Sequence, residues 1–400
     1  MNRMTLHSRR RRTGGVTLIE LLVAMAIGLV VTLAVTSMVI VGESRKRSTT
    51  SFNDANQSGN YAAYVLDRAL RSAGSGFTQA WDLGIFGCQL NIKRGSDTVL
   101  PRTTAFPAPF AGVPQAVRMA PVLIYRPASG SDVLIVMGGN SSAGDIARPV
   151  RSIGSATNKL RLDNTIGLRQ GDIGLLSRNG TPDCLVEQVH ASPAFLDSAG
   201  NDNLPLGGTY YAPRGQADNT DLATFVADGT AFFTPIGNLT ANNLQLQMFG
   251  VNANRTLVSY DLMQNAGGDT AAKRDALAQQ GLADGVVALR AVYAIDKNED
   301  GNFDLTNDAW VKPDDAAYNI TQMMSTPAKV RRVLAVRVAM VLRSTNYEKE
   351  VVSKSSLTLF DDLPDALNES YAISGDDLHF NHRVVEFTVP LRNMLLLPTS

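Results

Sequence analysis

The chain has 400 residues, of which 44% are hydrophobic, 18% charged and 6% aromatic, a composition that excludes a disordered chain. Lys and Arg number 37, as do Asp and Glu, but five arginines and no acid fall within residues 1–15. Without that segment, 37 − 5 = 32 basic residues face 37 acidic ones, a formal charge of −5. A chain of this sign is a poor generic binder of nucleic acid, so no nucleic-acid partner is expected.

A long apolar segment follows this basic leader. Residues 16–42 contain one ionisable side chain, Glu20. As a helix they would extend about 40 Å, more than the roughly 30 Å hydrocarbon core of a bilayer. The arginines should stay cytoplasmic, which places the C-terminal bulk outside. An uncleaved signal anchor leaves the acid unexplained, and a secretory signal cut after Ala26 would leave a fully apolar mature start.

The heptapeptide Gly14–Glu20 (GGVTLIE) resembles the prepilin-peptidase site of type IV pilins and type II secretion pseudopilins. In that family a basic leader is cut after the glycine, the new N-terminus is methylated, and an acid stands at mature position five. The resemblance implies that Gly15 ends the leader, that Val16 becomes the mature N-terminus and that Glu20 is the family's glutamate. Val16 departs from the usual Phe, which bears on methylation more than on cleavage.

Glu20 is expected to act in assembly. A buried carboxylate needs a partner. When subunits leave the bilayer and stack helix on helix, the free amine of a neighbour's first residue is available, and such a pair would fix the axial register. The alternative is an acid near the membrane interface that reaches water or stays protonated.

An amphipathic helix is expected to continue the apolar one. Apolar residues recur at spacings of three and four from Phe52 to Ala73, and no proline precedes Pro101. One helix should therefore run from about residue 16 to about residue 73, with Gly28 and Gly59 as weak points. The predicted segments are a cleaved leader (1–15), a transmembrane and assembly helix (16–42), its amphipathic continuation (43–74) and a β-rich domain (75–400).

Beyond residue 77, short apolar runs alternate with Gly, Pro, Asn and Asp, which predicts strands. Gly138–Ser142 reads as a turn, and a short helix is expected at Ala271–Gln280. The fold class expected is α+β and pilin-like, with the long helix packed on an antiparallel β-sheet domain. The predicted strands are Val122–Tyr125, Val133–Met137, Asp172–Ser177, Leu185–Val189, Leu244–Val251, Val286–Ile295, Val333–Arg343 and Arg383–Val389.

The strand Val333–Arg343 alternates in character. Val336, Val338, Met340 and Leu342 fall on one face, while Arg337 and Arg343 fall on the other, as in a half-exposed strand. These two arginines, with Arg331 and Arg332, are the candidates for a local basic patch, although the alternation favours an ordinary strand.

Several stretches resemble the PilW family of type IV pilus minor pilins: Gly171–Ser177 leading to Cys184, Leu282–Val286, Val333–Ser344 and Arg383–Asn393. The resemblance implies a low-abundance subunit that helps initiate the pilus. Its implied partners are prepilin peptidase, other minor pilins and the major pilin through the N-terminal helix, and a large adhesin-like tip protein. It also implies a single pass through the bacterial inner membrane with a periplasmic C-terminus, and later a place on the pilus or cell surface.

Residues 296–304 match the first nine positions of a calcium loop, with Gly301 at the sixth. An EF-hand would place Glu at position 12, where this chain has Asn307, so a calcium-binding hairpin loop is the hypothesis. A polar turn is the alternative. The oxygen donors would come from Asp296, Asn298, Asp300, Asn302 and Asp304.

Cys88 and Cys184 are the two cysteines. They could form one bridge in an oxidising compartment or stay two buried thiols, and the sequence leaves this open.

No hydrolase or metalloprotease motif occurs, so no catalysis is expected. The leading hypothesis is a minor pilin. The rivals are a type II secretion pseudopilin of the larger J type and, from another class, a membrane-tethered adhesin or DNA-uptake module.

Overall fold

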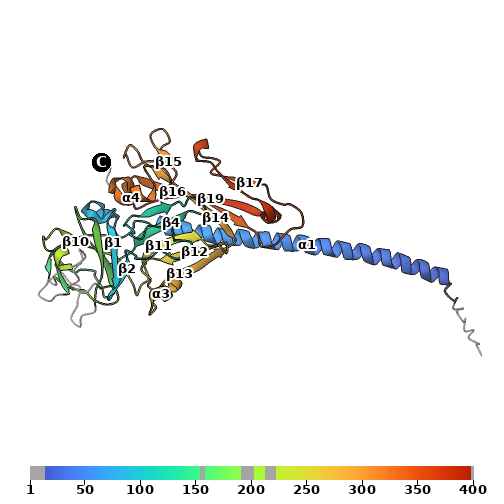
Figure 1. Cartoon of the computed structure of the whole chain (residues 1–400), viewed down its shortest axis with the longest axis horizontal. Coiled ribbons are helices and arrows are strands. Elements are labelled where there is room, and N and C mark those ends of the chain that lie inside the picture. The colour runs from blue at the N-terminus through green and yellow to red at the C-terminus, as the bar shows by residue number, and fades with distance from the viewer. Residues whose placement is uncertain (1–13, 154–157, 191–201, 212–221, 398–400) are drawn as a thin grey trace, which may run out of the picture. The chain divides into compact units, whose positions relative to one another are not determined.

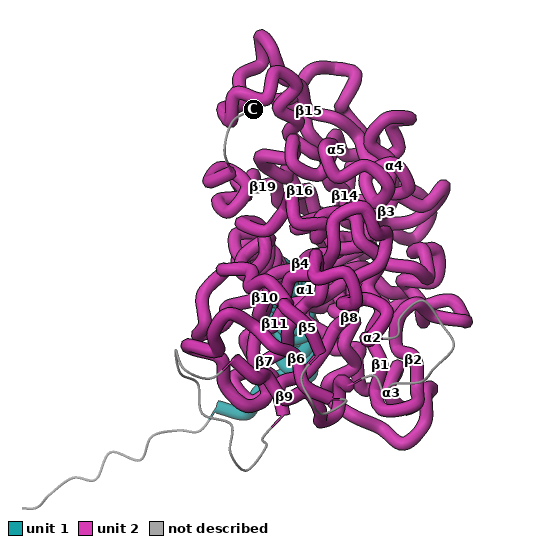
Figure 2. The backbone as a smooth tube through the Cα atoms, turned by 90° about the vertical axis from the view of Figure 1, so that its left-hand side faces the viewer, with its two compact units in different colours: residues 1–53 teal, residues 54–400 magenta. Residues whose placement is uncertain are grey.

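One uninterrupted helix, α1 (Leu18–Arg71), carries both the apolar run and the amphipathic segment that follows it (Figure 1). The structure is a computed structural model that describes residues 14–153, 158–190, 202–211 and 222–397. It divides into two units, Met1–Asn53 and Asp54–Ser400, which Figure 2 colours separately. The predicted long helix is confirmed, whereas the predicted leader lies outside the described residues except for Gly14 and Gly15.

Within the first unit, α1 exposes its apolar side chains. Those from Leu18 to Val41 are at least half exposed. The hydroxyls of Thr32, Thr36 and Ser37 donate to backbone carbonyls three or four residues earlier, at 2.9, 2.7 and 2.8 Å. These polar groups therefore need no water, as hydrocarbon surroundings require. By length and composition this helix could cross a membrane.

The second unit contains three larger sheets and one hairpin. The eight-stranded sheet has the order β2 (Asp97–Leu100), β1 (Gln89–Arg94), β8 (Asp183–Gln188), β7 (Asp172–Arg178), β10 (Ala231–Asn238), β5 (Arg148–Ile153), β6 (Lys159–Leu162), β9 (Asn203–Pro205). The five-stranded sheet has the order β13 (Gln279–Asp284), β12 (Thr256–Asp261), β11 (Leu244–Val251), β4 (Val133–Gly139), β3 (Val122–Tyr125). The four-stranded sheet has the order β15 (Ala309–Val311), β14 (Val286–Ile295), β16 (Val333–Arg343), β19 (His382–Pro390), and the hairpin pairs β17 (Ser356–Leu359) with β18 (Glu369–Ala372).

The eight predicted strands are all present, and the described strand pairs are antiparallel except for the parallel pair β1–β8. The α+β, pilin-like class is therefore confirmed. The five-stranded sheet contacts both other large sheets, through β4 and β11 against β10 and through β11 and β12 against β14 (Figure 1). The short helices are α2 (Leu222–Phe225), α3 (Ala271–Ala278), α4 (Ile320–Ser325), α5 (Pro327–Arg331) and the single turns Thr78–Ala80, Trp81–Ile85, Asp365–Leu367 and Gly375–His379.

In the second unit, the last turns of α1 form part of the main core. The predicted apolar positions Ala62, Leu66, Ala69 and Leu70 are buried there. Gly59 does not break the helix. A Cβ at Gly59 would lie 2.0 Å from Cδ1 of Leu342, so this glycine lets α1 approach β16 closely. Burial of Leu66 and Leu70 contributes roughly 1.5–3 kcal/mol each relative to exposure.

A buried ion cluster joins the sheets. Asp132, which is fully buried, accepts hydrogen bonds from Nε and Nη2 of Arg126 at 2.9 and 2.7 Å and from the Ala291 N–H at 2.8 Å. Arg126 and Arg290 also pair with Glu369 of β18, at 2.6 and 3.0 Å. Because a buried charge without its partner costs several kcal/mol, each member of the cluster requires the others. The cluster therefore holds β18 against β14 and the start of β4.

The expected half-exposed character of β16 is wrong. Val336, Val338, Met340 and Leu342 do face the main core, as predicted. The opposite face is covered as well, by a second apolar cluster that contains Ala339, Val341, Leu359 and Phe360. The covering residues Leu359 and Phe360 lie at the end of β17 and directly after it. Because β17 is short and distant from β16 in the sequence, the periodicity of β16 could not reveal this cover.

The expected turn at Gly138–Ser142 is displaced. Gly138 and Gly139 are the buried last residues of β4, and the turn follows them. A Cβ at Gly138 would lie 2.5 Å from the Ser72 carbonyl oxygen, and one at Gly139 would lie 1.7 Å from the Ile236 carbonyl oxygen. The Gly139 N–H donates to the Ser75 carbonyl at 2.9 Å. The two glycines are thus needed for backbone-to-backbone packing.

We predict that Gly139→Ala destabilises the second unit by about 3 kcal/mol or more, because a backbone oxygen cannot move aside as a side chain can. The free energy of unfolding of the full chain in detergent micelles measures this. Gly42→Ala is the matched control, since a Cβ there would meet nothing within 4 Å. Equal stability of the two variants would contradict the close packing.

Candidate functional site

The predicted processing site precedes α1. Residues 14–17 are not helical, and a Cβ at Gly14 or Gly15 would meet nothing within 4 Å. The Val16 side chain is 70% exposed. The peptide bond between Gly15 and Val16 is therefore open on all sides within the described chain.

The start of α1 is capped by Thr17, which belongs to the predicted processing motif. The Glu20 N–H donates to Oγ1 of Thr17 at 3.3 Å, and the Leu21 N–H donates to the Thr17 carbonyl at 3.1 Å. Thr17 and Glu20 have the spacing of a capping box. Glu20 lies in the first helical turn, where the helix dipole favours a negative charge. The signal for this local role in the sequence is Thr followed three residues later by Glu, which the predicted assembly role of Glu20 did not use.

Cys88 and Cys184 form a disulfide, which settles the question that the sequence left open. Cys184 lies in β8, opposite Leu90 of β1 in the parallel pair, and the two Cα atoms are 5.5 Å apart. Both side chains are buried, and they are 96 residues apart in the sequence. The bridge ties the segment that follows α1 to the middle of the eight-stranded sheet.

The carboxylates of the predicted calcium loop accept hydrogen bonds from the loop's own backbone. Asp296 accepts from the N–H groups of Glu299 and Gly301 at 2.6 and 2.9 Å. Asp304 accepts from Thr306 at 2.9 Å. Asp308, which the sequence analysis did not single out, is buried and accepts from Lys297 at 2.9 Å.

The remaining predicted metal-ligating residues of this loop form hydrogen bonds with each other. Asp300 accepts from the Asn298 amide at 2.9 Å and from the Asn302 N–H at 2.8 Å. Among the described residues, no three His, Cys, Asp or Glu side chains are grouped so that they could hold a metal. The hydrogen bonds are those of the polar-turn alternative, and calcium binding stays an untested prediction.

The arginines around β16 do not form a free basic patch. Arg332 pairs with Glu299, Arg343 pairs with Asp377, and Arg337 pairs with Asp362 and Glu386 at 2.6 and 2.8 Å. Arg331 lies over the Trp81 ring, 4.6 Å from its centre. The charges of Arg332, Arg337 and Arg343 are therefore matched by acids within the described chain, which agrees with an ordinary strand and not with a basic patch.

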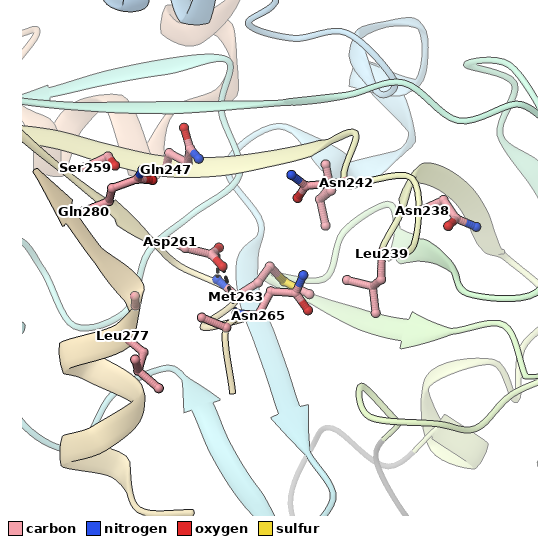
Figure 3. Close-up of a pocket in the computed structure, with 13 residues that line it drawn as sticks. Asn238, Leu239, Asn242, Gln247, Ser259, Asp261, Met263, Asn265, Leu277 and Gln280 are labelled. Carbon is pink, nitrogen blue, oxygen red and sulfur yellow. Dashed lines mark hydrogen bonds between the residues drawn. The ribbon is translucent and has the colours of Figure 1, made fainter. Parts of the chain in front are cut away.

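A polar cavity of about 320 Å³ lies on one face of the five-stranded sheet, between the β10–β11 turn and α3 (Figure 3). Gln247, Ser259 and Gln280 line it from three adjacent strands, and Leu277 of α3 lines one side. Burial raises the pKa of the Asp261 carboxyl at its base, and this outweighs the opposing effect of hydrogen bonds from the Asn265 and Met263 N–H groups. No sequence motif pointed to this cavity.

Comparison with known families agrees with the N-terminal and C-terminal parts of this picture. Residues 249–393 match the family described as Type IV Pilus-assembly protein W, and residues 10–36 match the Prokaryotic N-terminal methylation motif. The resemblance to the PilW family is confirmed. The PilW match begins within β11 and includes the four-stranded sheet, while the eight-stranded sheet lies outside both matched ranges. No curated protein and no solved structure matches the chain.

We predict that replacing both cysteines, with Cys88→Ala and Cys184→Ala, lowers the free energy of unfolding by about 4–5 kcal/mol. The reason is that the bridge closes a long loop in the unfolded chain. Urea denaturation of the wild type and the double variant measures the difference, and adding a reductant to the double variant is the control. Two reactive thiols in the denatured, unreduced wild type would refute the bridge.

Proposed function

We propose that this chain is a minor pilin that is cleaved after Gly15, joins a type IV pilus through α1 and helps to initiate pilus assembly within a tip complex. The observation that carries the proposal is the coincidence of features in one helix. An accessible Gly15–Val16 bond precedes a capped start with Glu20. An exposed apolar stretch follows, and the same helix ends in the core of a β-rich unit.

The segments of the chain then have distinct roles. Residues 1–15 are the leader, residues 16–42 the membrane and assembly helix, residues 43–74 its amphipathic continuation, and residues 75–400 the periplasmic and later extracellular domain. The mature chain is held in the inner membrane until it enters the pilus. Prepilin peptidase, other minor pilins, the major pilin and a large tip adhesin are the proposed partners.

Glu20 contributes the specific contact in this proposal. Once cleavage frees the amine of Val16, every subunit carries a cation at the start of its helix and an acid one turn later. A neighbour displaced along the helix axis can then pair its amine with Glu20, away from water. Because an unpaired carboxylate in apolar surroundings is costly, only the register that pairs it is favoured.

The two matched families are structural components of pili or a pilin processing motif, which supports a structural role over catalysis. A J-type pseudopilin of type II secretion would share the N-terminal motif. The PilW match favours the pilus, and the two readings differ in what is lost on deletion: surface pili in one case, secreted enzymes in the other.

We predict that Glu20→Gln and Glu20→Val leave the mature size unchanged but reduce incorporation into pili, because both remove the charge that pairs with the neighbour's amine. A deletion strain complemented with each variant, scored for surface pili and for the subunit in sheared pili, measures this. Glu43→Gln is the control, since Glu43 is an exposed acid of the same helix beyond the apolar run. Normal pili with Glu20→Val would reject the pairing.

We also predict that Gly15→Glu blocks cleavage, because a side chain then occupies the position that the peptidase requires to be open. Immunoblotting of the same strains should show a precursor that is longer by the 15-residue leader and is absent from sheared pili. Mature-sized protein from this variant would place the cleavage site elsewhere, and pili unaffected by deletion of the gene would overturn the proposed function.

A further inference from the structure

The polar cavity on the five-stranded sheet has an ordered set of side chains. Phe249 of β11 lies opposite Ser259 of β12, and Ser259 lies opposite Gln280 of β13. Gln247 lies opposite Asp261, two residues along each strand. Because residues in direct register share a face of the sheet, Gln247, Ser259 and Gln280 project to the same side. Figure 3 shows these three side chains around the cavity.

These three side chains have no partner within the part of the chain that the structure describes. Neighbouring amides of the same region are engaged: Asn238 donates to Asp172 at 2.7 Å, and Gln245 accepts from Ser72 at 2.5 Å. The side chains of Asn242 and Asn265, which line the same cavity, likewise have no partner among the described residues. Ser259 is buried and Gln247 is half-buried, so their unpaired polar groups lose hydration without compensation unless a ligand supplies the hydrogen bonds, whereas Gln280 is exposed to solvent.

The charge of the cavity narrows the class of ligand. No Lys, Arg or His is among its described lining residues, so an anion would find no cation there. Its one acid, Asp261, already accepts from the Met263 and Asn265 N–H groups at 2.9 and 2.8 Å. Amides and hydroxyls both donate and accept hydrogen bonds, as the hydroxyl groups of a sugar do. The lining therefore complements a neutral, polyhydroxylated molecule.

The shape extends the site beyond a single sugar ring. Leu244 and Gln247 also line an adjoining cavity of about 630 Å³, whose far side is formed by Tyr61, Tyr64 and the cation Arg68 of α1. These tyrosines are 53% and 60% exposed. A tyrosine ring offers an apolar face for the C–H side of a sugar and a hydroxyl for hydrogen bonding. Two linked cavities of this size lie within the range of ligand sites.

An extended peptide fits this place less well. A peptide strand binds by adding to the edge of a sheet, where backbone groups are unpaired. Here the cavity lies on the face of β11, β12 and β13 and not along the free edge of β13, and β11 and β12 are paired on both sides.

We propose that the groove formed by these two cavities binds an oligosaccharide, with a neutral sugar residue in the first cavity. Gln247, Ser259 and Gln280 would hold one sugar residue by hydrogen bonds, and Tyr61 and Tyr64 would support the next residues of the chain. This site lies on the second unit and does not depend on the proposed role in pilus initiation. It would give the subunit a direct contact with glycans on a surface that the pilus reaches.

The test is a glycan array with neutral and anionic oligosaccharides, probed with the full mature chain in a zwitterionic detergent that lacks a sugar headgroup. Titration calorimetry then follows with the best neutral trisaccharide. We expect neutral glycans to bind and heparin fragments not to bind. Gln247→Ala and Gln280→Ala should each weaken binding about 2- to 10-fold, as expected for the loss of one or two hydrogen bonds. Tyr64→Ala should weaken a trisaccharide more than a disaccharide.

Gln57→Ala is the matched control, because Gln57 is an exposed amide outside both cavities. Each variant must keep the wild-type melting temperature, so that weaker binding reports on the site and not on folding. Binding of no neutral glycan on the array, a preference for heparin, or equal affinity of wild type and the Gln247→Ala, Gln280→Ala double variant would each overturn the proposal. Since the assay uses purified protein, its outcome is separate from that of the pilus assays.

Discussion

The fold of the second unit depends on the close contact between the end of α1 and the end of β4. Gly138 and Gly139 place the β4 backbone against the Ser72 and Ile236 carbonyls, at distances that any side chain would prevent. Ile236 belongs to β10, so the contact at Gly139 brings the eight-stranded sheet against β4 of the five-stranded sheet. Gly59, an earlier residue of α1, also allows close packing, in this case against the Leu342 side chain of β16. The helix and strands of all three large sheets thus share one core, because a few glycines allow close packing between them.

The two halves of α1 meet opposite physical demands. In the first unit the helix keeps its apolar side chains exposed, and its hydroxyl groups donate to its own backbone, which suits lipid or a bundle of like helices. In the second unit, small and apolar residues such as Ala62 and Leu66 are buried. A continuous helix therefore carries an exposed apolar surface at its start and ends in a domain held by sheets, the Cys88–Cys184 bridge and the Asp132 ion cluster.

Predictions from the sequence succeeded where a structure depends on a local pattern and failed where it depends on contacts between distant segments. The strands β3, β11, β14 and β16 have the predicted bounds, because each is a strongly apolar run whose pattern is local. Strands such as β10, which contains Pro235, and β17, which is short, carry no such pattern. Asp296 and its neighbours matched a metal-loop spacing, but that spacing serves equally for carboxylates that cap backbone N–H groups. Only the directions of the side chains separate the two.

The sequence by itself determined the long helix, the single acid Glu20 within its apolar run, the match of the N-terminus to a methylation motif and the α+β class. These depend on residues that are adjacent or one helical turn apart. Tertiary structure alone decided that Cys88 meets Cys184, that the second face of β16 is covered, and that Gln247, Ser259 and Gln280 share one groove. Each of these joins residues from separate strands, and strand register is set by packing across the whole sheet, which no local pattern records.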